Sequence, residues 1–221
     1  MPFVNRVEAG RLLAKALASY KGQHPVVLAL PRGGVPVAAE IATALGAPLD
    51  LILVRKIGVP SQPELAMGAV VDGGAPITVR NDDVVRLTGV TEEEFAAVRA
   101  EQLAEIERRR VKYLGSRAHP DVAGRVAIVV DDGVATGATT RAALQATRMR
   151  KPSKLVLAVP VAPTDSLANL RDLADDIVCL EDHEMFGAIG LYYSDFRQVS
   201  DDEVIKLLAQ YPVEPAVPAA R

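Results

Sequence analysis

The sequence is poor in several residue types, and each shortage narrows what the chain can be. It contains one cysteine, Cys179, so an intrachain disulfide is excluded. Cys179 lies in an apolar run, which predicts a buried strand residue rather than a nucleophile. Tryptophan is absent, and phenylalanine and tyrosine together number only nine. No apolar run approaches the roughly 18 residues that a membrane-spanning helix needs, so we expect no membrane partner.

The charge is nearly balanced, with 25 basic and 28 acidic residues and a net charge of −3. This balance argues against general binding to nucleic acid or to membrane surfaces. The first ten residues carry charge where a signal peptide needs apolar residues, so we expect a cytoplasmic location. The length of 221 residues suits one α/β domain, predicted over 1–211, followed by a disordered proline-containing tail over 212–221.

The most informative stretch runs from Val126 to Thr140. Five apolar residues predict a buried parallel strand, a small-residue loop follows, and a helical pattern begins near Thr139. The glycines and the helix start offer backbone N–H groups to a phosphate, whereas two adjacent carboxylates suit sugar hydroxyls or hydrated Mg²⁺. We therefore predict a site for ribose 5-phosphate formed by Asp131, Asp132, Gly133, Val134, Ala135, Thr136, Gly137, Ala138, Thr139 and Thr140. The alternative is an ordinary strand-to-helix turn capped by a threonine.

The segment VVDDGVATGATT resembles the phosphoribosyl-pyrophosphate (PRPP) motif of type I phosphoribosyltransferases, in which two acids and a Thr-Gly loop follow apolar residues. The resemblance implies an α/β fold with a three-layer parallel sheet and a small irregular hood. It implies a Mg²⁺-dependent pentosyltransferase of nucleotide metabolism that transfers 5-phosphoribosyl from PRPP to a nitrogenous acceptor and releases pyrophosphate. A homodimer is compatible with it.

Two upstream segments follow predicted strands and resemble parts of the same family. Pro31-Arg32-Gly33-Gly34 resembles the pyrophosphate loop, which commonly carries a strained or cis peptide, and Pro31 would make a cis bond less costly. The second segment, Arg55-Lys56-Ile57-Gly58-Val59-Pro60, resembles the Arg-Lys-x-Gly-x-Pro segment of adenine phosphoribosyltransferases. A mobile loop begins at that segment in those enzymes, and it would correspond to 57–67 here. The implied pyrophosphate-binding residues are Arg32, Gly33, Gly34, Arg55 and Lys56. Taken alone, the segments could equally be a plain turn and a solvated basic pair.

The resemblance also implies catalytic roles. Asp131 and Asp132 would hold the ribose hydroxyls and the metal, directly or through water, and Lys56 would neutralise the leaving group. Oxopurine enzymes of the family have an aspartate before the Thr-Gly of the loop, but this chain has Ala135, as adenine and uracil enzymes do. A hypoxanthine or guanine acceptor is therefore disfavoured.

The segment 181–196 holds four of the nine aromatic residues. Similar enzymes place a hood here over the acceptor, and we predict a hood formed by about 1–20 and 181–199. The acceptor pocket would use His183, Phe186, Tyr192 and Tyr193, with Phe196 as a further candidate. The alternatives are that at least two of these aromatics pack in a small subdomain core and that His183 is a surface residue.

The remaining pattern alternates strands and helices, which predicts a parallel sheet with right-handed crossovers. Strands are expected at 26–30, 49–54, 155–161 and 177–180, a hairpin at 69–79, and helices at 5–20, 36–45, 91–114, 164–174 and 201–210. Basic residues 108–112 end one helix and are interpreted as partners of its dipole.

Two functions compete with the transferase. One is a PRPP-sensing regulatory protein of the same fold, which the acidic balance disfavours. The other is a phosphate-binding protein without turnover.

Overall fold

The computed structural model describes residues 2–72 and 76–211, and its centre is a five-stranded parallel sheet. The strand order is β2-β1-β6-β7-β8, and every neighbouring pair is parallel. Burial on both faces explains why these segments are continuous apolar runs rather than alternating ones. The strands are β1 (Val26–Ala29), β2 (Leu49–Leu51), β6 (Val126–Val130), β7 (Lys154–Pro163) and β8 (Asp176–His183).

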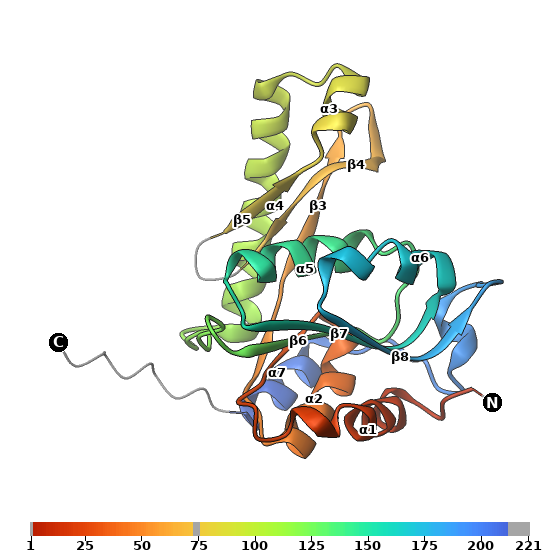
Figure 1. Ribbon diagram of the computed structural model, residues 1–221. Helices are drawn as coiled ribbons and strands as arrows, with labels where there is room; N and C mark the ends of the chain where they lie inside the picture. Colours follow the sequence, from red (N-terminus) through yellow and green to blue (C-terminus); the bar gives the residue numbers. More distant parts are fainter. Residues whose placement is uncertain (1, 73–75, 212–221) are drawn as a thin grey trace.

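Helices cover both faces of this sheet, which gives the three layers that the resemblance implies (Figure 1). One face carries α1 (Arg6–Ala16), α2 (Gly34–Leu45) and α7 (Asp201–Ala209), and the other carries α5 (Ala138–Met149) and the short α6 (Thr164–Ala168). Gly46 ends α2 in the left-handed conformation, and Ser200 opens α7 with a capping box. The described residues also include three short 3₁₀ helices: Ala18–Tyr20, Arg171–Leu173 and Ile189–Tyr192.

A second, antiparallel sheet stands on this core (Figure 1). Its order is β3-β4-β5, formed by β3 (Val54–Val59), β4 (Gln62–Val71) and β5 (Ile77–Arg80). The β4–β5 pairing confirms the predicted hairpin, although residues 73–75 of its turn lie outside the described residues. The short α3 (Asp82–Thr88), which the sequence analysis did not predict, follows, and then the long α4 (Glu92–Leu114) packs beside β3.

Several expected boundaries are wrong. The strand expected over 49–54 ends at Leu51, so Arg55 and Lys56 lie within β3 instead of leaving a strand end. The loop expected over 57–67 is mostly paired strand, because β3 and β4 form a hairpin. The helix expected to 174 ends at Ala168, and its N-cap is Pro163 without a side-chain bond, so neither Thr164 nor Asp165 caps it.

The chain's first residues meet the segment after β8. Phe3 forms a β-bridge with Tyr193, and both pack in a small cluster with Ala9 and Val161. The expected tail over 212–221 lies outside the described residues. Within 2–72 and 76–211, no helix is both long and apolar enough to cross a membrane.

Candidate functional site

The candidate site lies where β1 and β6 end side by side. The Leu30 N–H donates to the Val130 carbonyl at 2.9 Å, so the loop after β1 and the loop after β6 begin next to each other. Ligands of open α/β sheets bind at this carboxyl edge. The structure therefore brings together Arg32, Gly33 and Gly34 with the two acids of the β6 loop.

Glycine is required where these two loops touch. A Cβ at Gly33 would lie 2.0 Å from Asp132 Oδ2, and one at Gly34 would lie 2.7 Å from the Val130 carbonyl oxygen. The neighbouring cis peptide joins Pro31 to Arg32. The cis peptide that the resemblance implies for this loop is therefore present. The expectation that Pro31 would ease it is wrong, because that benefit applies only to the bond preceding a proline.

The adjacent acids Asp131 and Asp132 occupy different environments. Asp132 is buried, and its Oδ2 lies 2.7 Å from Arg6 Nε. Asp131 is half-buried, and its Oδ1 accepts the N–H of Asp132 at 2.9 Å. Burial raises the pKa of Asp131 well above its ordinary value, and the neighbouring charge of Asp132 raises it further. Asp131 is thus the acid that is partly open to a ligand, whereas Asp132 is held by the protein.

Arg6, which the sequence analysis did not select, links the acids to the hood. Its Nη1 donates to the Arg197 carbonyl at 2.8 Å, and its guanidinium carbon lies 3.9 Å from the centre of the Phe196 ring. The Tyr193 hydroxyl completes the connection by donating to the Asp132 carbonyl at 2.6 Å. One feature of the sequence could have indicated this contact. Arg6 has helical spacing with Ala9 and Leu13, so it lies on the buried face of α1, where a charged residue needs a partner.

The loop from Gly133 to Gly137 leads into α5 without a side-chain cap. Gly137 is the N-cap residue, with φ of 76° and no side-chain hydrogen bond, so the alternative of a threonine cap is wrong. The first-turn amides of a helix have no partner within the helix, and the loop exposes Ala135, Thr136, Ala138 and Thr139 beside them. Gly133, Val134 and Thr140 are buried and support the loop. A phosphate fits such an arrangement.

A hollow of about 760 Å³ separates this loop from the second sheet. Thr136, Ala138 and Arg141 line one wall, and Arg80 and Arg86 line the opposite wall. Asp82 and Asp83 line that wall as well and pair with Arg80 and Arg86, so the charges that face the loop there are largely balanced. The second sheet was not expected to reach this side of the site.

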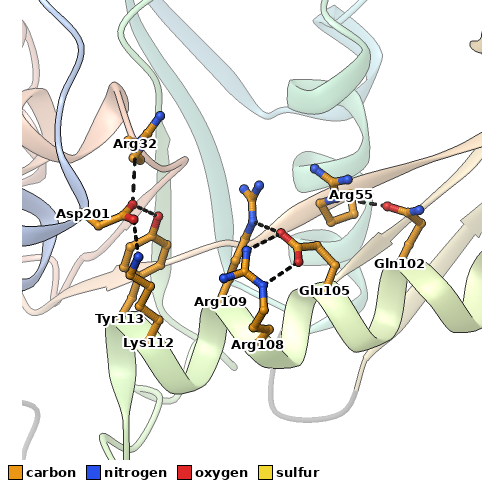
Figure 2. A network of polar contacts seen from close by, with 9 residues as sticks. All are labelled: Arg32, Arg55, Gln102, Glu105, Arg108, Arg109, Lys112, Tyr113 and Asp201. Atoms are coloured by element: carbon orange, nitrogen blue, oxygen red, sulfur yellow. Dashed lines mark hydrogen bonds and ion pairs between the residues drawn. The ribbon is translucent and has the colours of Figure 1, made fainter.

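The predicted basic pair on β3 makes contacts within the second sheet and α4. Arg55 Nε donates to Gln102 Oε1 at 3.0 Å, and Lys56 Nζ lies 3.1 Å from Glu64 Oε2 on the exposed surface. Within the described part of the chain, neither residue contacts Asp131 or Asp132. Arg32 points toward α4 and α7, where its Nη1 lies 3.5 Å from Asp201 Oδ1 (Figure 2).

The hood aromatics divide into two groups. Phe186 and Tyr192 stack with ring centres 4.9 Å apart, and the ring centre of His183 lies 4.5 Å from that of Tyr192. All three are half-buried. Tyr193 is buried against Phe3 and Phe196, which is the subdomain packing considered as the alternative.

Comparison with known proteins identifies the family. The model of the phosphoribosyl transferase domain matches residues 6–197. The chain belongs to the phosphoribosyltransferase family. It is 49% identical over 206 residues to "Putative phosphoribosyl transferase MT0597" of Mycobacterium tuberculosis (strain CDC 1551 / Oshkosh), covering 93% of this chain and 46% of that protein. The same figures hold for Rv0571c of strain ATCC 25618 / H37Rv.

Solved structures agree with the fold of this phosphoribosyltransferase. TT1426 from Thermus thermophilus has 40% identity and a TM-score of 0.86, covering 96% of this chain and 100% of that chain. AQ2163 from Aquifex aeolicus, at 11% identity and a TM-score of 0.51, shares the fold alone, covering 95% and 87%. The chain spans about half the length of the mycobacterial relatives.

The phosphoribosyltransferase resemblance implies Mg²⁺, and the side chains fit a loosely held ion. Within the described residues, no cluster of three or more His, Cys, Asp or Glu side chains could hold a metal. Mg²⁺ commonly binds one or two carboxylates together with water and substrate phosphates. Asp131 could provide such a carboxylate, whereas Asp132 Oδ2 is occupied by Arg6.

Proposed function

We propose that this phosphoribosyltransferase transfers the 5-phosphoribosyl group of PRPP to a nitrogenous acceptor and releases pyrophosphate. The observation that carries the proposal is the nesting of two loops, in which Gly33 lies against Asp132 at the shared end of β1 and β6. In this arrangement the proposed pyrophosphate loop lies beside the acids for the ribose and the uncapped helix start for the 5-phosphate. The three groups suit the three parts of PRPP.

In the proposed reaction, the bond from the ribose anomeric carbon to the pyrophosphate oxygen breaks, and the electron pair leaves with pyrophosphate. A bond forms between the same carbon and a nitrogen of the acceptor, which loses a proton to water. Positive charge develops on the ribose and negative charge on the leaving group, so fixed charges at both ends lower the barrier. The chain supplies Asp131 near the ribose and Arg32, with Arg55 and Lys56 on β3, for the pyrophosphate.

Asp131 and the loop 133–140 have separate roles in this proposal. Asp131 accepts the ribose hydroxyls, and the loop amides and threonine hydroxyls bind the 5-phosphate and fix the sugar in position. Asp132 positions the loops through Gly33 and Arg6. A bound Mg²⁺ would supply charge neutralisation at the pyrophosphate, with Asp131 as its protein ligand.

The half-buried aromatic group of His183, Phe186 and Tyr192 supports a planar heterocycle as the acceptor. Aromatic faces bind such rings by offset stacking. Ala135 stands where oxopurine enzymes have an aspartate, so the phosphate loop offers the acceptor no carboxylate. The proposal therefore favours an acceptor other than hypoxanthine or guanine.

The test is PRPP binding by calorimetry with Mg²⁺, followed by pyrophosphate release with a panel of nucleobases and related heterocycles. We expect Asp131→Asn to weaken PRPP binding at least tenfold, because an amide is a weaker acceptor than a carboxylate. Asp172→Asn, at an exposed position in another segment, is the matched control. Wild-type protein that binds no PRPP would contradict the proposal. Binding without product from any acceptor would favour the regulatory alternative.

A further inference from the structure

One face of α4 connects the two segments proposed to hold pyrophosphate. Gln102, Glu105, Arg109 and Tyr113 are spaced by three and four residues, so they share a face of the helix. At one end, Gln102 accepts a hydrogen bond from Arg55 at 3.0 Å. At the other end, the Tyr113 hydroxyl donates to Asp201, the same carboxylate that pairs with Arg32.

A hollow of about 400 Å³ lies between this end of α4 and the loop after β1. Its lining includes four cations and one carboxylate, namely Arg32, Arg108, Arg109, Lys112 and Asp201. Glu105 adds a second carboxylate beside it through its contacts with Arg108 and Arg109. Four cations against two carboxylates leave two positive charges in excess.

The two carboxylates hold these cations together. Hydrogen bonds from Arg108 and Arg109 lower the pKa of Glu105 to about 2. Hydrogen bonds from Lys112 and then Tyr113 lower the pKa of Asp201 to about 2. Both groups therefore stay ionised and keep like charges close together, where an anionic ligand would be attracted.

Arg109 is the cation best placed to meet such a ligand. Its contact with Glu105 uses Nε at 2.7 Å, and no contact within the described residues uses its Nη atoms. Figure 2 shows its guanidinium in the space between Arg32 and Arg55. Its side chain is 33% exposed, so it is fixed by packing yet open to solvent. A guanidinium of this kind can bind phosphate oxygens through paired donors.

We propose that α4 is a third pyrophosphate-binding element, in which Arg109, assisted by Arg108 and Lys112, binds the diphosphate group of the substrate and the departing pyrophosphate. This inference rests on the proposed function. From the sequence alone, residues 108–112 are interpreted only as partners of the helix dipole. In the structure, Arg108, Arg109 and Lys112 instead line a hollow together with Arg32.

Arg109→Gln removes the proposed contact, and Arg110→Gln is its matched control. Arg110 lies one residue further along α4, is equally exposed at 33%, pairs with Glu107 and does not line the hollow. Binding of inorganic pyrophosphate, PRPP and ribose 5-phosphate is measured by calorimetry for both variants and wild type. We expect R109Q to weaken pyrophosphate and PRPP binding about tenfold, while ribose 5-phosphate binding stays unchanged. R110Q should match wild type for all three ligands, and Arg109→Lys should restore part of the affinity.

Three other results would contradict the role of α4, and one of them would also contradict the proposed function. PRPP binding that R109Q leaves intact overturns the role of α4 but leaves the proposed function standing. Equal losses for pyrophosphate and ribose 5-phosphate in R109Q would mean a structural effect and would also overturn it. Failure of wild-type protein to bind both pyrophosphate and PRPP would contradict the inference and the proposed function together.

Discussion

Arg6 and Asp132, 126 residues apart in the sequence, form a buried ion pair at 2.7 Å. Their side chains are 10% and 12% exposed, so the pair is almost removed from water. We expect Arg6→Gln to lower the free energy of unfolding by roughly 3 kcal/mol, because it leaves a buried carboxylate without its partner. PRPP affinity should also fall, since Asp132 would no longer fix the loop after β1. Chemical denaturation and calorimetry measure the two effects.

Arg11→Gln is the control for this prediction. Arg11 lies on the same helix and pairs with Glu40, but its side chain is 67% exposed. The unfolding free energy should therefore change by less than about 1 kcal/mol. Equal destabilisation by the two substitutions would show that burial of the Arg6 pair has no special role.

Gly33→Ala should disturb the site more than the fold. The added Cβ would lie 2.0 Å from Asp132 Oδ2 and 2.4 Å from its Cγ, so the carboxylate must move. We expect a loss of about 1–3 kcal/mol in stability, typical of overpacking, with at least a tenfold loss in PRPP affinity. Gly22→Ala is the control, because Gly22 has φ of 82° and open space around it. That variant should lose stability but retain affinity for PRPP.

Tyr192 and Tyr193 are neighbours with opposite expected roles. Tyr192 stacks in the half-buried group with Phe186, so Tyr192→Ala should raise KM for the acceptor and leave PRPP affinity unchanged. Tyr193→Phe removes a buried hydrogen bond to the Asp132 carbonyl and should lower stability by about 1 kcal/mol. Steady-state kinetics with both substrates varied, together with thermal melting, would reveal whether the roles are reversed.

His119 should make stability depend on pH. Its Nδ1 lies 2.7 Å from the fully buried Asp50 Oδ2, and this hydrogen bond raises the pKa of His119. The folded pKa is therefore above the unfolded value of about 6.5. The contribution to stability is complete below about pH 6.5 and is lost as the pH rises through the folded pKa.

Urea denaturation between pH 6 and pH 9 measures this loss. His119→Gln should remove most of the pH dependence in that range. His24→Asn is the control, because His24 is exposed and asparagine tolerates its φ of 53°. A wild-type slope that H119Q leaves unchanged would assign the dependence to other groups.

Local signals in the sequence predicted the elements on which the site is built. β6 has the predicted bounds, because five consecutive apolar residues stop at a pair of acids. The helix predicted over 91–114 is α4, and a capping box of Thr91 and Glu94 fixes its start. The two loops were each predicted at a strand end, and they meet because parallel strands end at one edge of a sheet.

The second sheet and the Arg6 contact could not be predicted in the same way. Register shifts on both sides of Gly58 interrupt the alternation that would identify β3 as a half-buried strand. The pairing of Arg6 with Asp132 depends on how α1 packs against the sheet, and sequence spacing holds no information about that. The role proposed for the α4 face could not be predicted for the same reason. It depends on Arg32 and Asp201, which lie far away in the sequence and are brought beside α4 by the fold.

The β3–β4 ladder has a consequence for the pyrophosphate site proposed above. A disordered segment must lose chain entropy when it orders around a substrate, and this loss weakens binding. Arg55 and Lys56 instead lie opposite Val70 and Ala69 in a paired ladder, with Arg55 also tied to Gln102. In the proposed pyrophosphate site, the backbone of both residues is therefore ordered before the ligand arrives, and binding there costs little chain entropy.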